Sequence, residues 1–431
     1  MRGLSARRLL RILEVSSMRF HNEIDLDEYV GRLGGRLWEV GGALRDEVLG
    51  RAPHDRDYLV TGVRADELGF ERVVGSDFPV FQVEIAGTTC EVALARRERK
   101  NGNGHRDFSV FSDKNVTVEE DLSRRDVTAN SIARSVRTGE WVDPYGGRRD
   151  ISARVLRHTS KAFAEDPLRA YRVARFAATL RFDVAPETLT LVSTLRRELR
   201  HLPGERVWKE TEKALAVEGS SAYFRVLKEA GLLGVHFPEV EGLDVPDRHD
   251  GTALNHTLKV VDAGRSAVER FSLLVHDAGK GLTPKESHPA HHGHDDLGEA
   301  PVRELCRRLR VPKNFEAAGV LSATQHMRAK MAAEMRPGKL FNWVTAHRTH
   351  VHHILDVSFL DSAHREGANY DDEVVRFENV RRRVRQVFEV ERTITGKALL
   401  AEGLEPGKYF GNALFQRRVE AFERRRIGAE A

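Results

Sequence analysis

The sequence predicts an α+β protein in which a mixed sheet with helices is followed by all-helical domains. Between residues 37 and 157, short apolar runs alternate with turn signals, a pattern typical of strands and helices mixed in one domain. From Glu165 onward, apolar residues recur at helical spacing, as at Leu168, Tyr171 and Ala174. The chain of 431 residues is too long for one ordinary core, so two or more domains are expected.

Changes of composition divide the chain into segments. The first residues are rich in arginine and could be a transit peptide, a docking helix or the product of an upstream start codon, with Met18 as the alternative start; a dispensable extension is favoured. Polar, turn-forming residues at 241–255 predict a linker. The expected segments are an N-terminal extension (1–36), a mixed α/β head (37–157), a helical neck and body (158–240), a histidine-rich helical domain (241–370) and a charged helical tail (371–431).

Within the head, residues 80–95 predict a β-hairpin. Phe81, Val83 and Ile85 alternate with polar residues, so they would share one face of a strand. Gly87 stands where the turn is expected, because glycine adopts the positive φ angles of tight hairpin turns without steric cost.

Composition and charge narrow the classes of partner. No apolar stretch approaches the roughly 20 residues of a transmembrane helix, so no membrane partner is expected. The net charge is only +4, but arginines occur in runs, which indicates either a polyanionic partner or a solvated arginine-rich surface. The two cysteines, Cys90 and Cys306, exclude a disulfide scaffold and fit a reduced cytoplasmic location.

The most informative segment is WEVGGALRDEVLGRAPHDRDYLV, residues 38–60. Gly41-Gly42 follows an apolar run, a helix-like stretch carries Arg45, and Asp55 and Asp57 precede a second apolar run. On a strand, positions two apart face the same side, and paired carboxylates suit divalent metals that hold a nucleoside triphosphate. A Gly-Gly turn or an Asp-x-Asp pair alone is weak evidence, but their combination indicates phosphoryl or nucleotidyl transfer.

Two further motifs could bind the nucleotide. Arg125, in RRDVTAN, could grip the triphosphate with its planar guanidinium, or the motif could simply begin a helix. Asp166 and Arg169 could be an ordinary helix start, since Asp before Pro is a common N-cap. They also offer one acceptor and one donor side by side, which would select cytosine and adenine over uracil and guanine. Arg172 and Arg175 continue this helical row and could hold the phosphates.

The second helical domain carries a candidate metal site. His276-Asp277 ends an apolar helix, and mixed nitrogen and oxygen ligands suit Mn, Ni, Co, Mg or Fe, with Zn as a further option. Such a site can activate water against phosphoesters; the alternative is a purely structural helical domain. The expected ligands are His256, His276, Asp277 and Asp361, in a region that also holds histidines at 291, 292, 294 and 326.

These motifs together resemble a known family. VGGALRDEVLGRAPHDRDYLVTG, EVALARRERKNGNG, EEDLSRRDVTANSIA, AEDPLRAYRVARFAATLRF and LLVHDAGKGLTP are similar to class II tRNA nucleotidyltransferases, specifically the bacterial multifunctional CCA-adding type with a C-terminal HD domain. The resemblance covers roughly residues 38–330. By this resemblance, Gly42 and Arg45 contact the nucleotide, Asp55 and Asp57 bind Mg²⁺, Arg125, Arg172 and Arg175 hold ATP or CTP, and Asp166 and Arg169 read the base.

The resemblance also sets expectations for activity and partners. It implies a nucleotidyltransferase head, template-independent addition of C, C and A to the tRNA acceptor end, and a monomer or homodimer. The HD domain would be a metal-dependent phosphohydrolase for 2′,3′-cyclic phosphates and 2′-nucleotides, using Ni²⁺ or Mn²⁺, or Mg²⁺. Two rivals share the motifs: a poly(A) polymerase or partial CC- or A-adding enzyme, and a catalytically dead RNA-binding regulator.

Overall fold

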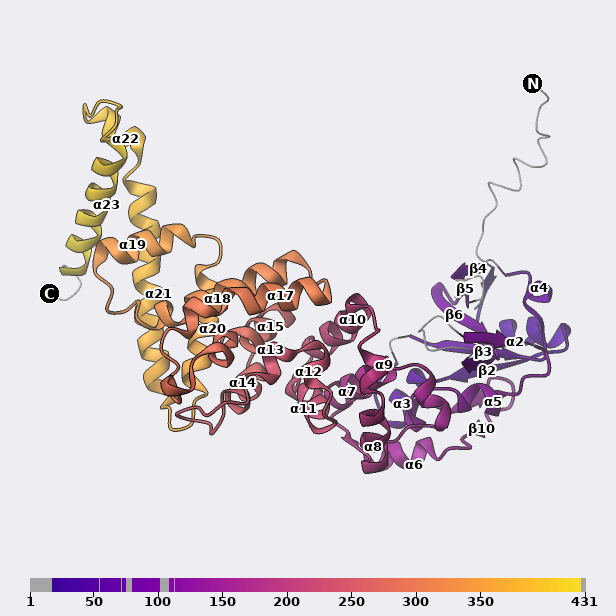
Figure 1. Ribbon diagram of the computed structural model, residues 1–431. Helices are drawn as coiled ribbons and strands as arrows, with labels where there is room; N and C mark the ends of the chain where they lie inside the picture. The colour runs from indigo at the N-terminus through magenta and orange to yellow at the C-terminus, as the bar shows by residue number, and fades with distance from the viewer. Residues whose placement is uncertain are drawn as a thin grey trace, which may run out of the picture. The chain divides into compact units, whose positions relative to one another are not determined.

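The computed structural model describes residues 18–53, 55–70, 72–74, 80–100, 108–111 and 113–427 (Figure 1). Contacts divide the chain into two compact units, the first running to Leu202 with Glu229–Gly231 added, and the second formed by Pro203–Lys228 and the chain from Leu232 onward. The division falls inside the range 158–240 that the sequence assigned to one neck and body. Trp208 lies in α10 (Gly204–Leu215) and packs edge-on against Phe271 and Phe315, so this helix belongs to the second unit.

The first unit is built on a mixed sheet with strand order β1-β5-β6-β3-β2-β9-β10, and β4 pairs with β5. Two pairs are parallel, β1 with β5 and β3 with β6, and the others are antiparallel. Smaller ladders join β7 to β8 and β11 to β12. The strands are β1 Arg19–Phe20, β2 Arg36–Val40, β3 Asp57–Thr61, β4 Arg72–Val74, β5 Val80–Ile85, β6 Thr88–Leu94, β7 Arg97–Lys100, β8 Phe108–Phe111, β9 Ala133–Ser135, β10 Trp141–Val142, β11 Val155–Leu156 and β12 Asp183–Val184.

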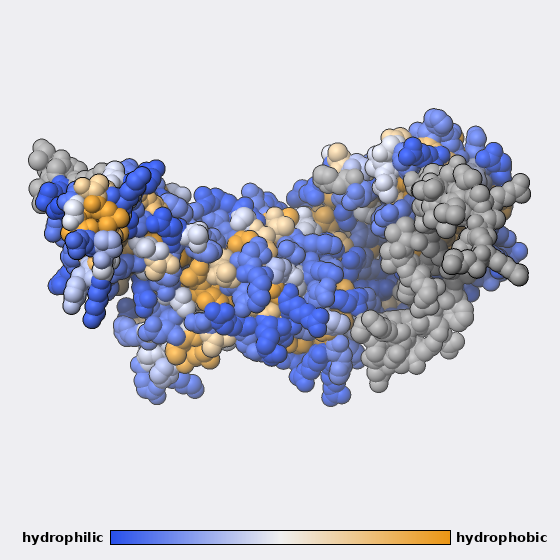
Figure 2. Space-filling view, turned by 90° about the horizontal axis from the view of Figure 1, so that it is seen from above, coloured by the Kyte–Doolittle hydropathy of each residue, from blue (hydrophilic) through white to orange (hydrophobic). Residues whose placement is uncertain are grey.

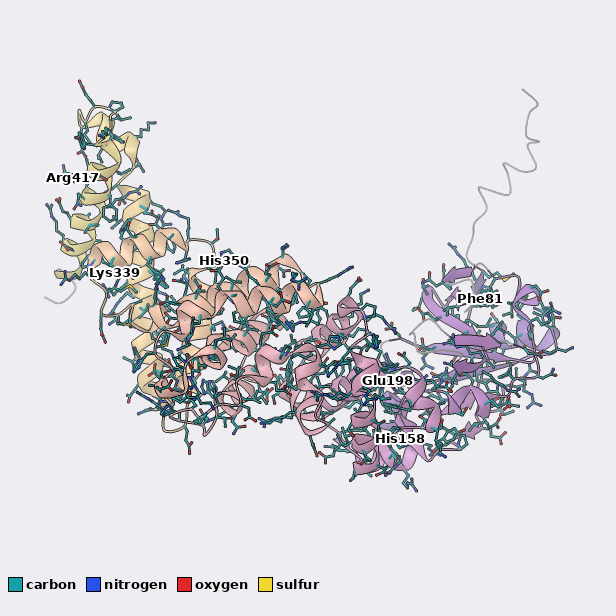
Figure 3. All side chains as sticks on the ribbon, in the orientation of Figure 1. Phe81, His158, Glu198, Lys339, His350 and Arg417 are labelled. Carbon is teal, nitrogen blue, oxygen red and sulfur yellow. The ribbon has the colours of Figure 1, made fainter. Side chains whose placement is uncertain are left out.

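The hairpin expected at 80–95 is confirmed as β5 and β6. Its turn contains Ala86 and Gly87, both at positive φ (50° and 79°), as a tight hairpin turn requires. Phe81 and Val83 are fully buried on one face, so the predicted alternation holds (Figure 3 labels Phe81).

Helices cover this sheet and continue beyond it in the first unit. The helix expected from the spacing of Leu168, Tyr171 and Ala174 is present as α7, and all three side chains are buried. The sheet and the helical segments after it confirm the α+β fold class. The helical segments are α2 Glu23–Arg32, α3 Gly42–Val48, α4 Ala65–Leu68, α5 Val118–Ser123, η1 Thr128–Asn130, α6 Gly147–Ala153, η2 Lys161–Glu165, α7 Arg169–Leu180, α8 Pro186–Thr194 and α9 Arg196–Leu199.

The N-terminal prediction needs correction for its second half. Residues 1–36 were expected to be a dispensable extension, but β1 pairs with β5 and α2 packs on the sheet. Leu26 and Val30 of α2 are fully buried. The side chain of Asp27 accepts a hydrogen bond from Arg137 Nε at 2.8 Å. The segment was misjudged because α2 presents only a narrow apolar stripe among charged residues.

The second unit is helical throughout its described part. Among the described residues no helix is long and apolar enough to cross a membrane, and hydrophilic residues cover most of the surface visible in Figure 2. Its helical segments are α10 Gly204–Leu215, α11 Ser221–Glu229, α12 Leu233–His236, α13 Pro238–Glu241, α14 Ala253–Val261, α15 Ala267–Val275, η3 Ala278–Leu282, η4 Lys285–Ser287, α16 His294–Leu297, α17 Glu299–Leu309, α18 Lys313–Lys330, α19 Pro337–Ala346, α20 Val351–Ala363, α21 Tyr370–Thr393, α22 Gly396–Ala401 and α23 Phe410–Ile427.

Two expectations for the second unit also change. The segment 371–431 is helical as expected, but it is no separate tail, because Phe377 of α21 and Phe422 of α23 share a core with Phe341 of α19. The segment 241–255 is not a free linker: Leu243 is fully buried and its carbonyl oxygen accepts a hydrogen bond from Leu254 N at 2.7 Å.

The packing of α2 predicts a stability change. Leu26→Ala should lower the free energy of unfolding of the first unit by about 2–5 kcal/mol, because it removes a fully buried side chain and leaves a cavity. Urea unfolding followed by tryptophan fluorescence would measure it. Ile24→Ala is the matched control, since Ile24 is 47% exposed on the same helix and should change stability by less than about 0.5 kcal/mol. Equal stability of both variants and the wild type would mean that this segment is dispensable.

Candidate nucleotide and metal sites

The Gly41-Gly42 turn joins β2 to α3 as the sequence predicted. Gly41 has φ of 78°, a conformation that other residues rarely adopt. A Cβ atom at Gly41 would also lie 2.9 Å from Nη1 of Arg125. The positive φ favours glycine here, and a side chain at this position would also displace the Arg125 guanidinium.

Asp55 and Asp57 lie next to this turn. β2 and β3 are antiparallel, and their register pairs Val40, directly before the turn, with Asp57. Asp57 is the first residue of β3, and Asp55 lies two residues before the strand rather than on it. The register thus sets Asp57 beside the glycines, and Asp55 precedes the strand from which the sequence predicted that both carboxylates project.

The structure adds a third carboxylate to this group. Glu91 of β6 is the register partner of Asp57 in the parallel ladder. Burial raises the pKa of Asp57, the carboxylates of Glu91 and Asp55 also raise it, and the positive charge of Arg125 lowers it. Carboxylates that disfavour each other's ionisation form a site that a divalent cation with oxygen ligands stabilises, so these residues fit Mg²⁺.

Arg45 is held in place from two sides. Its Nη1 donates to Oδ1 of Asn130 at 2.6 Å, and its Nε donates to Oδ1 of Asp46 at 3.0 Å. The side chain is only 12% exposed. Arg45 therefore presents a positive charge of fixed orientation beside the glycine turn.

Arg125 is anchored by a buried acid. Its guanidinium pairs with Oδ2 of Asp121 at 3.2 Å, and Asp121 also pairs with Arg124 at 2.8 Å. Burial opposes ionisation of Asp121, but the two arginines outweigh it and hold the pKa of this carboxyl below its usual range. α5 ends before the motif, and the short 3-10 helix η1 begins inside it at Thr128, so a helix start and a fixed Arg125 are both present. Asp121 holds Arg125 next to Gly41.

Arg172 of α7 is linked to the head through Asp126. Its Nε and Nη2 lie 2.8 Å and 2.7 Å from Oδ2 of Asp126, while Oδ1 of Asp126 accepts from the Asn130 amide at 3.1 Å. Burial opposes ionisation of Asp126, but Arg172, Asn130 and the Val127 N–H outweigh it and hold the pKa of this carboxyl below its usual range.

Phe176 gathers three of the predicted arginines. The guanidinium carbons of Arg175, Arg172 and Arg45 lie 4.1, 5.5 and 5.9 Å from the centre of its ring, within the range of cation–π attraction. The sequence did not single out Phe176, and its place one residue after Arg175 gave no signal of this role. Positive charge concentrated around one buried ring suits a polyanion such as a triphosphate.

Asp166 and Arg169 lie at the start of α7, and the side chain of each forms a hydrogen bond with a backbone group. Oδ1 of Asp166 accepts from Leu168 N at 3.1 Å, the capping contact that the sequence gave as the ordinary alternative. Arg169 is 6% exposed and donates to the carbonyl oxygen of Ala162 at 2.8 Å. This bond holds the guanidinium at the start of α7.

In the second unit the four expected ligands come together. Nε2 of His276 lies 3.2 Å from Oδ2 of Asp277 and 3.7 Å from Oδ1 of Asp361, and Nε2 of His256 lies 3.0 Å from the same Asp361 atom. All four side chains are buried. Lys280 pairs with Asp277 at 2.8 Å. The sequence assigned no role to that lysine, whose position three residues after Asp277 was the available signal.

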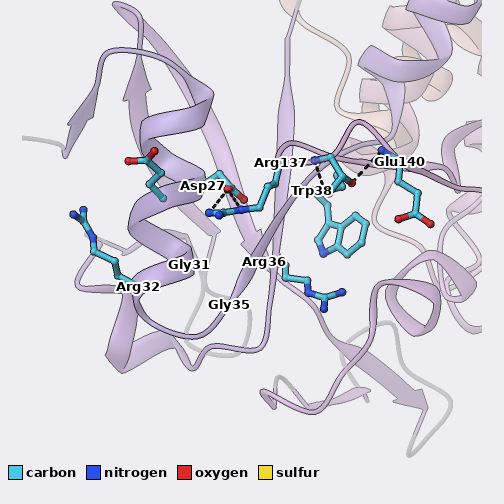
Figure 4. Close-up of a pocket in the computed structure, with 11 residues that line it drawn as sticks. Asp27, Gly31, Arg32, Gly35, Arg36, Trp38, Arg137 and Glu140 are labelled. Atoms are coloured by element: carbon cyan, nitrogen blue, oxygen red, sulfur yellow. Dashed lines mark hydrogen bonds and ion pairs between the residues drawn. The ribbon is translucent and has the colours of Figure 1, made fainter.

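A separate hollow of about 830 Å³ lies on the first unit between α2, β2 and the turn after β9 (Figure 4). Its lining includes Trp38, Arg36 and the Asp27–Arg137 pair, and the expected site residues are not part of it. The residues predicted to bind nucleotide and metal therefore lie outside the lining of this hollow.

Comparisons with known proteins agree with this geometry. Residues 37–157 match the family described as Poly A polymerase head domain, and residues 181–243 match the probable RNA and SrmB-binding site of polymerase A. The chain is 41% identical over 407 residues to the multifunctional CCA protein of Nitrosococcus oceani, which covers 90% of this chain and 98% of that protein.

Solved structures share the fold. The CCA-adding enzyme of Bacillus stearothermophilus in complex with CTP has a TM-score of 0.60 and 23% identity, and covers 95% of this chain and 98% of that one. The CCA-adding enzyme of Thermotoga maritima complexed with tRNA has a TM-score of 0.63 and 18% identity, and covers 92% of this chain and 89% of that one. At these identities the likeness concerns the fold.

Proposed function

Because the chain belongs to the class II tRNA nucleotidyltransferases, the family of bacterial multifunctional CCA-adding enzymes, we propose that it adds C, C and A to tRNA 3′ ends. CTP and ATP are the substrates and pyrophosphate is released. The observation that carries the proposal is the register that sets Asp57 beside the glycine turn, with Arg125 next to Gly41 and its positive charge acting on Asp57.

The geometry supports direct transfer. The tRNA 3′-oxygen bonds to the α-phosphorus, the bond from that phosphorus to pyrophosphate breaks, and the hydroxyl proton leaves to solvent, so no residue needs to act as a nucleophile. Mg²⁺ held by Asp55 and Asp57 would supply activation of the hydroxyl and stabilisation of the leaving group. Glu91 adds a third carboxylate to the same group.

The chain's own arginines bind and orient the triphosphate. Arg45, Arg172 and Arg175 lie near the ring of Phe176. Arg125, which follows α5, lies next to the glycine turn. Guanidinium groups grip phosphate oxygens in pairs. The glycines at 41 and 42 let the backbone approach the phosphates closely.

Base choice is assigned to the start of α7. Asp166 would accept from the amino group of cytosine or adenine, and Arg169 would donate to the adjacent ring nitrogen. Uracil and guanine present donor and acceptor in the reverse order, so they would leave both side chains unpaired.

The first test is a gel assay with tRNA that lacks CCA, Mg²⁺ and each nucleotide alone and in pairs. Addition should stop after two C with CTP alone and after A with both nucleotides. Asp55→Asn should lower the rate of nucleotide addition at least about 100-fold. Replacing a residue that only orients a metal ligand already lowers metal affinity or activity about 10–100-fold, and Asp55 is proposed to hold the metal directly. Asp66→Asn, an exposed acid on α4, should leave the rate unchanged. A long series of A additions with ATP alone would indicate a poly(A) polymerase. The absence of any addition would indicate a catalytically inactive RNA-binding protein.

The second test concerns base choice. Asp166→Ala should raise incorporation of UTP and GTP about tenfold or more, since leaving a hydrogen-bonding group unpaired costs about 1–3 kcal/mol. Single-turnover rates with each nucleotide would measure it. Asp166→Asn keeps an oxygen that caps Leu168 N but adds amide donors. Increased incorporation of UTP and GTP by both variants would support a role of Asp166 in base recognition. An increase in the alanine variant alone would mean that Asp166 acts only by capping α7.

We also propose that the HD cluster of the second unit is a metal-dependent phosphohydrolase for 2′,3′-cyclic phosphates and 2′-nucleotides. The convergence of His256, His276, Asp277 and Asp361 in a buried site favours it. Nε2 of His276 and Oδ2 of Asp277 and of Asp361 are buried, and their partners are other charged side chains of the cluster and its two lysines. A Ni²⁺, Mn²⁺ or Mg²⁺ ion bound by these atoms would supply activation of water.

Hydrolysis of 2′,3′-cyclic AMP with each of these metals tests the second activity. Asp277→Asn should reduce it at least about 100-fold, because a direct ligand is altered, while CCA addition by the same variant continues. His292→Ala, an exposed histidine of the same region, should hydrolyse normally. If Asp277→Asn and the wild type hydrolyse 2′,3′-cyclic AMP at equal rates, this cluster does not catalyse the hydrolysis.

A further inference from the structure

Arg56 lies between the two aspartates that are proposed to hold Mg²⁺. Its Nη1 donates to Oε1 of Glu39 at 2.8 Å, and the Glu39 side chain is only 5% exposed. Because Asp55, Arg56 and Asp57 are consecutive, a fixed Arg56 side chain restricts the backbone from which both carboxylates project. Glu39 therefore holds the segment 55–57 from a different strand.

Glu39 belongs to β2, which lies between β3 and β9 in the sheet. The register places Arg134 of β9 opposite Glu39 on one side and Tyr58 of β3 opposite it on the other. Arg56 comes two residues before Tyr58, so it is a diagonal neighbour of Glu39, within reach of a long side chain. Oε2 of Glu39 accepts from Nη2 of Arg134 at 2.7 Å. Each carboxylate oxygen of Glu39 thus binds a different arginine.

Arg134 connects Glu39 to α3. Its Nη1 and Nη2 lie 2.5 Å and 2.9 Å from Oε1 and Oε2 of Glu47. The hydrogen bond from Arg134 is the main reason that the pKa of the Glu47 carboxyl lies below its usual value. The guanidinium carbon of Arg134 also lies 5.3 Å from the centre of the Trp141 ring, within the range of cation–π attraction. Arg134 is therefore held by three neighbouring side chains.

The segments that Glu39 joins each carry part of the proposed nucleotidyltransferase site. The segment 55–57 carries the two aspartates, and α3 carries Arg45. β9 begins three residues after Asn130, which accepts a hydrogen bond from Arg45. One buried carboxylate thus links the metal-binding segment to both sides of the Arg45–Asn130 contact.

The carboxylates of the site repel one another until a cation binds. The charges of Asp55 and Glu91 both disfavour ionisation of Asp57. A rigid backbone segment keeps such groups close, whereas a loose segment lets them move apart. Glu39 can supply this rigidity, because a buried carboxylate paired with two arginines is costly to separate from either of them.

We propose that Glu39 is a positioning residue, which acts through Arg56 to hold Asp55 and Asp57 at the spacing that divalent metal binding requires. This role rests on the proposed function, because that function assigns the metal to these two aspartates. Residues that only orient a metal ligand change metal affinity or activity about 10–100-fold when they are replaced. Glu39 itself contacts the arginines and not the metal.

Direct metal binding tests this role without measuring turnover. The parent is the full chain carrying Asp277→Asn, in which the metal cluster of the second unit is weakened. Mn²⁺ titrations followed by the electron paramagnetic resonance of the free ion give dissociation constants. The binding that disappears when Asp55→Asn and Asp57→Asn are added identifies the site in the head.

Glu39→Gln should raise the Mn²⁺ dissociation constant of the head site about tenfold or more. Glutamine keeps the shape of the side chain, but its amide nitrogen donates and cannot accept from a guanidinium. One arginine therefore loses its partner. The Mg²⁺ concentration that gives half-maximal nucleotide addition should rise by a similar factor, whereas the KM for tRNA should stay the same.

Arg56→Ala shows whether Glu39 acts through Arg56. By charge alone, loss of a positive side chain beside the aspartates would strengthen cation binding. Loss of positioning would weaken it, so Arg56→Ala should also raise the Mn²⁺ dissociation constant, by about tenfold. The double variant with Glu39→Gln should bind Mn²⁺ no more weakly than the weaker single variant, because both changes break the same contact.

Glu84→Gln is the matched control. Glu84 also pairs with an arginine on the same sheet, since Nε of Arg19 lies 3.1 Å from its Oε2, but it belongs to β5. Its Mn²⁺ and Mg²⁺ constants should equal those of the parent. Urea unfolding checks that each variant is folded under the assay conditions. Arg56, which is 40% exposed, provides a variant that should fold even if Glu39→Gln does not.

The outcomes separate this role from the proposed function. Unchanged Mn²⁺ binding by folded Glu39→Gln would overturn the positioning role and leave Glu39 a structural residue. Tighter binding by Arg56→Ala would also overturn it, because Glu39 would then act only through its charge. If Mn²⁺ binding depends on Glu39, Asp55 and Asp57 but the wild type adds no nucleotide to tRNA, CCA addition fails and the positioning role stands. Mn²⁺ binding that is independent of Asp55 and Asp57 would overturn both.

Discussion

The first unit depends on one hydrogen-bonded chain of side chains, from Arg45 through Asn130 and Asp126 to Arg172. It joins α3, the short helical turn η1 and α7, three segments far apart in sequence. Asp126 and Asn130 are buried, and a buried acid is stable only when its partners are in place. The network therefore fixes two arginines near the ring of Phe176 before any nucleotide arrives, so binding has to order these side chains little.

The local part of the head site could be predicted from sequence. Gly41, Arg45 and Asp57 lie within one short unit, where the order strand, turn, helix, strand already brings them together. Glu91 could not be found this way. It joins the carboxylates only because β3 pairs in parallel with β6, which brings together two residues 34 positions apart. Neither segment alone encodes this pairing.

Polar residues caused the clearest errors. Asp250 lies in a run of turn-forming residues that predicted a linker, yet it orients His256 from behind. Likewise α2 was taken for an extension because buried Leu26 is surrounded by acids. Both segments have the composition of an exposed surface segment. Which of their residues have a structural role becomes clear only from the residues that they contact in the folded protein. The sequence singles out His276 and Asp277 because His-Asp after an apolar helix is unusual in itself.

Lys280 and Lys330 give the aspartates of the second unit positive partners from within the chain. Unlike small domains whose folding free energy comes from their metal, this unit has internal counter-charges that let it fold before a metal arrives. The two proposed activities would then respond differently to nutrient supply. In a cell starved of transition metals, tRNA ends would still be completed with abundant magnesium, while phosphoester hydrolysis would pause and resume on the same polypeptide without new synthesis.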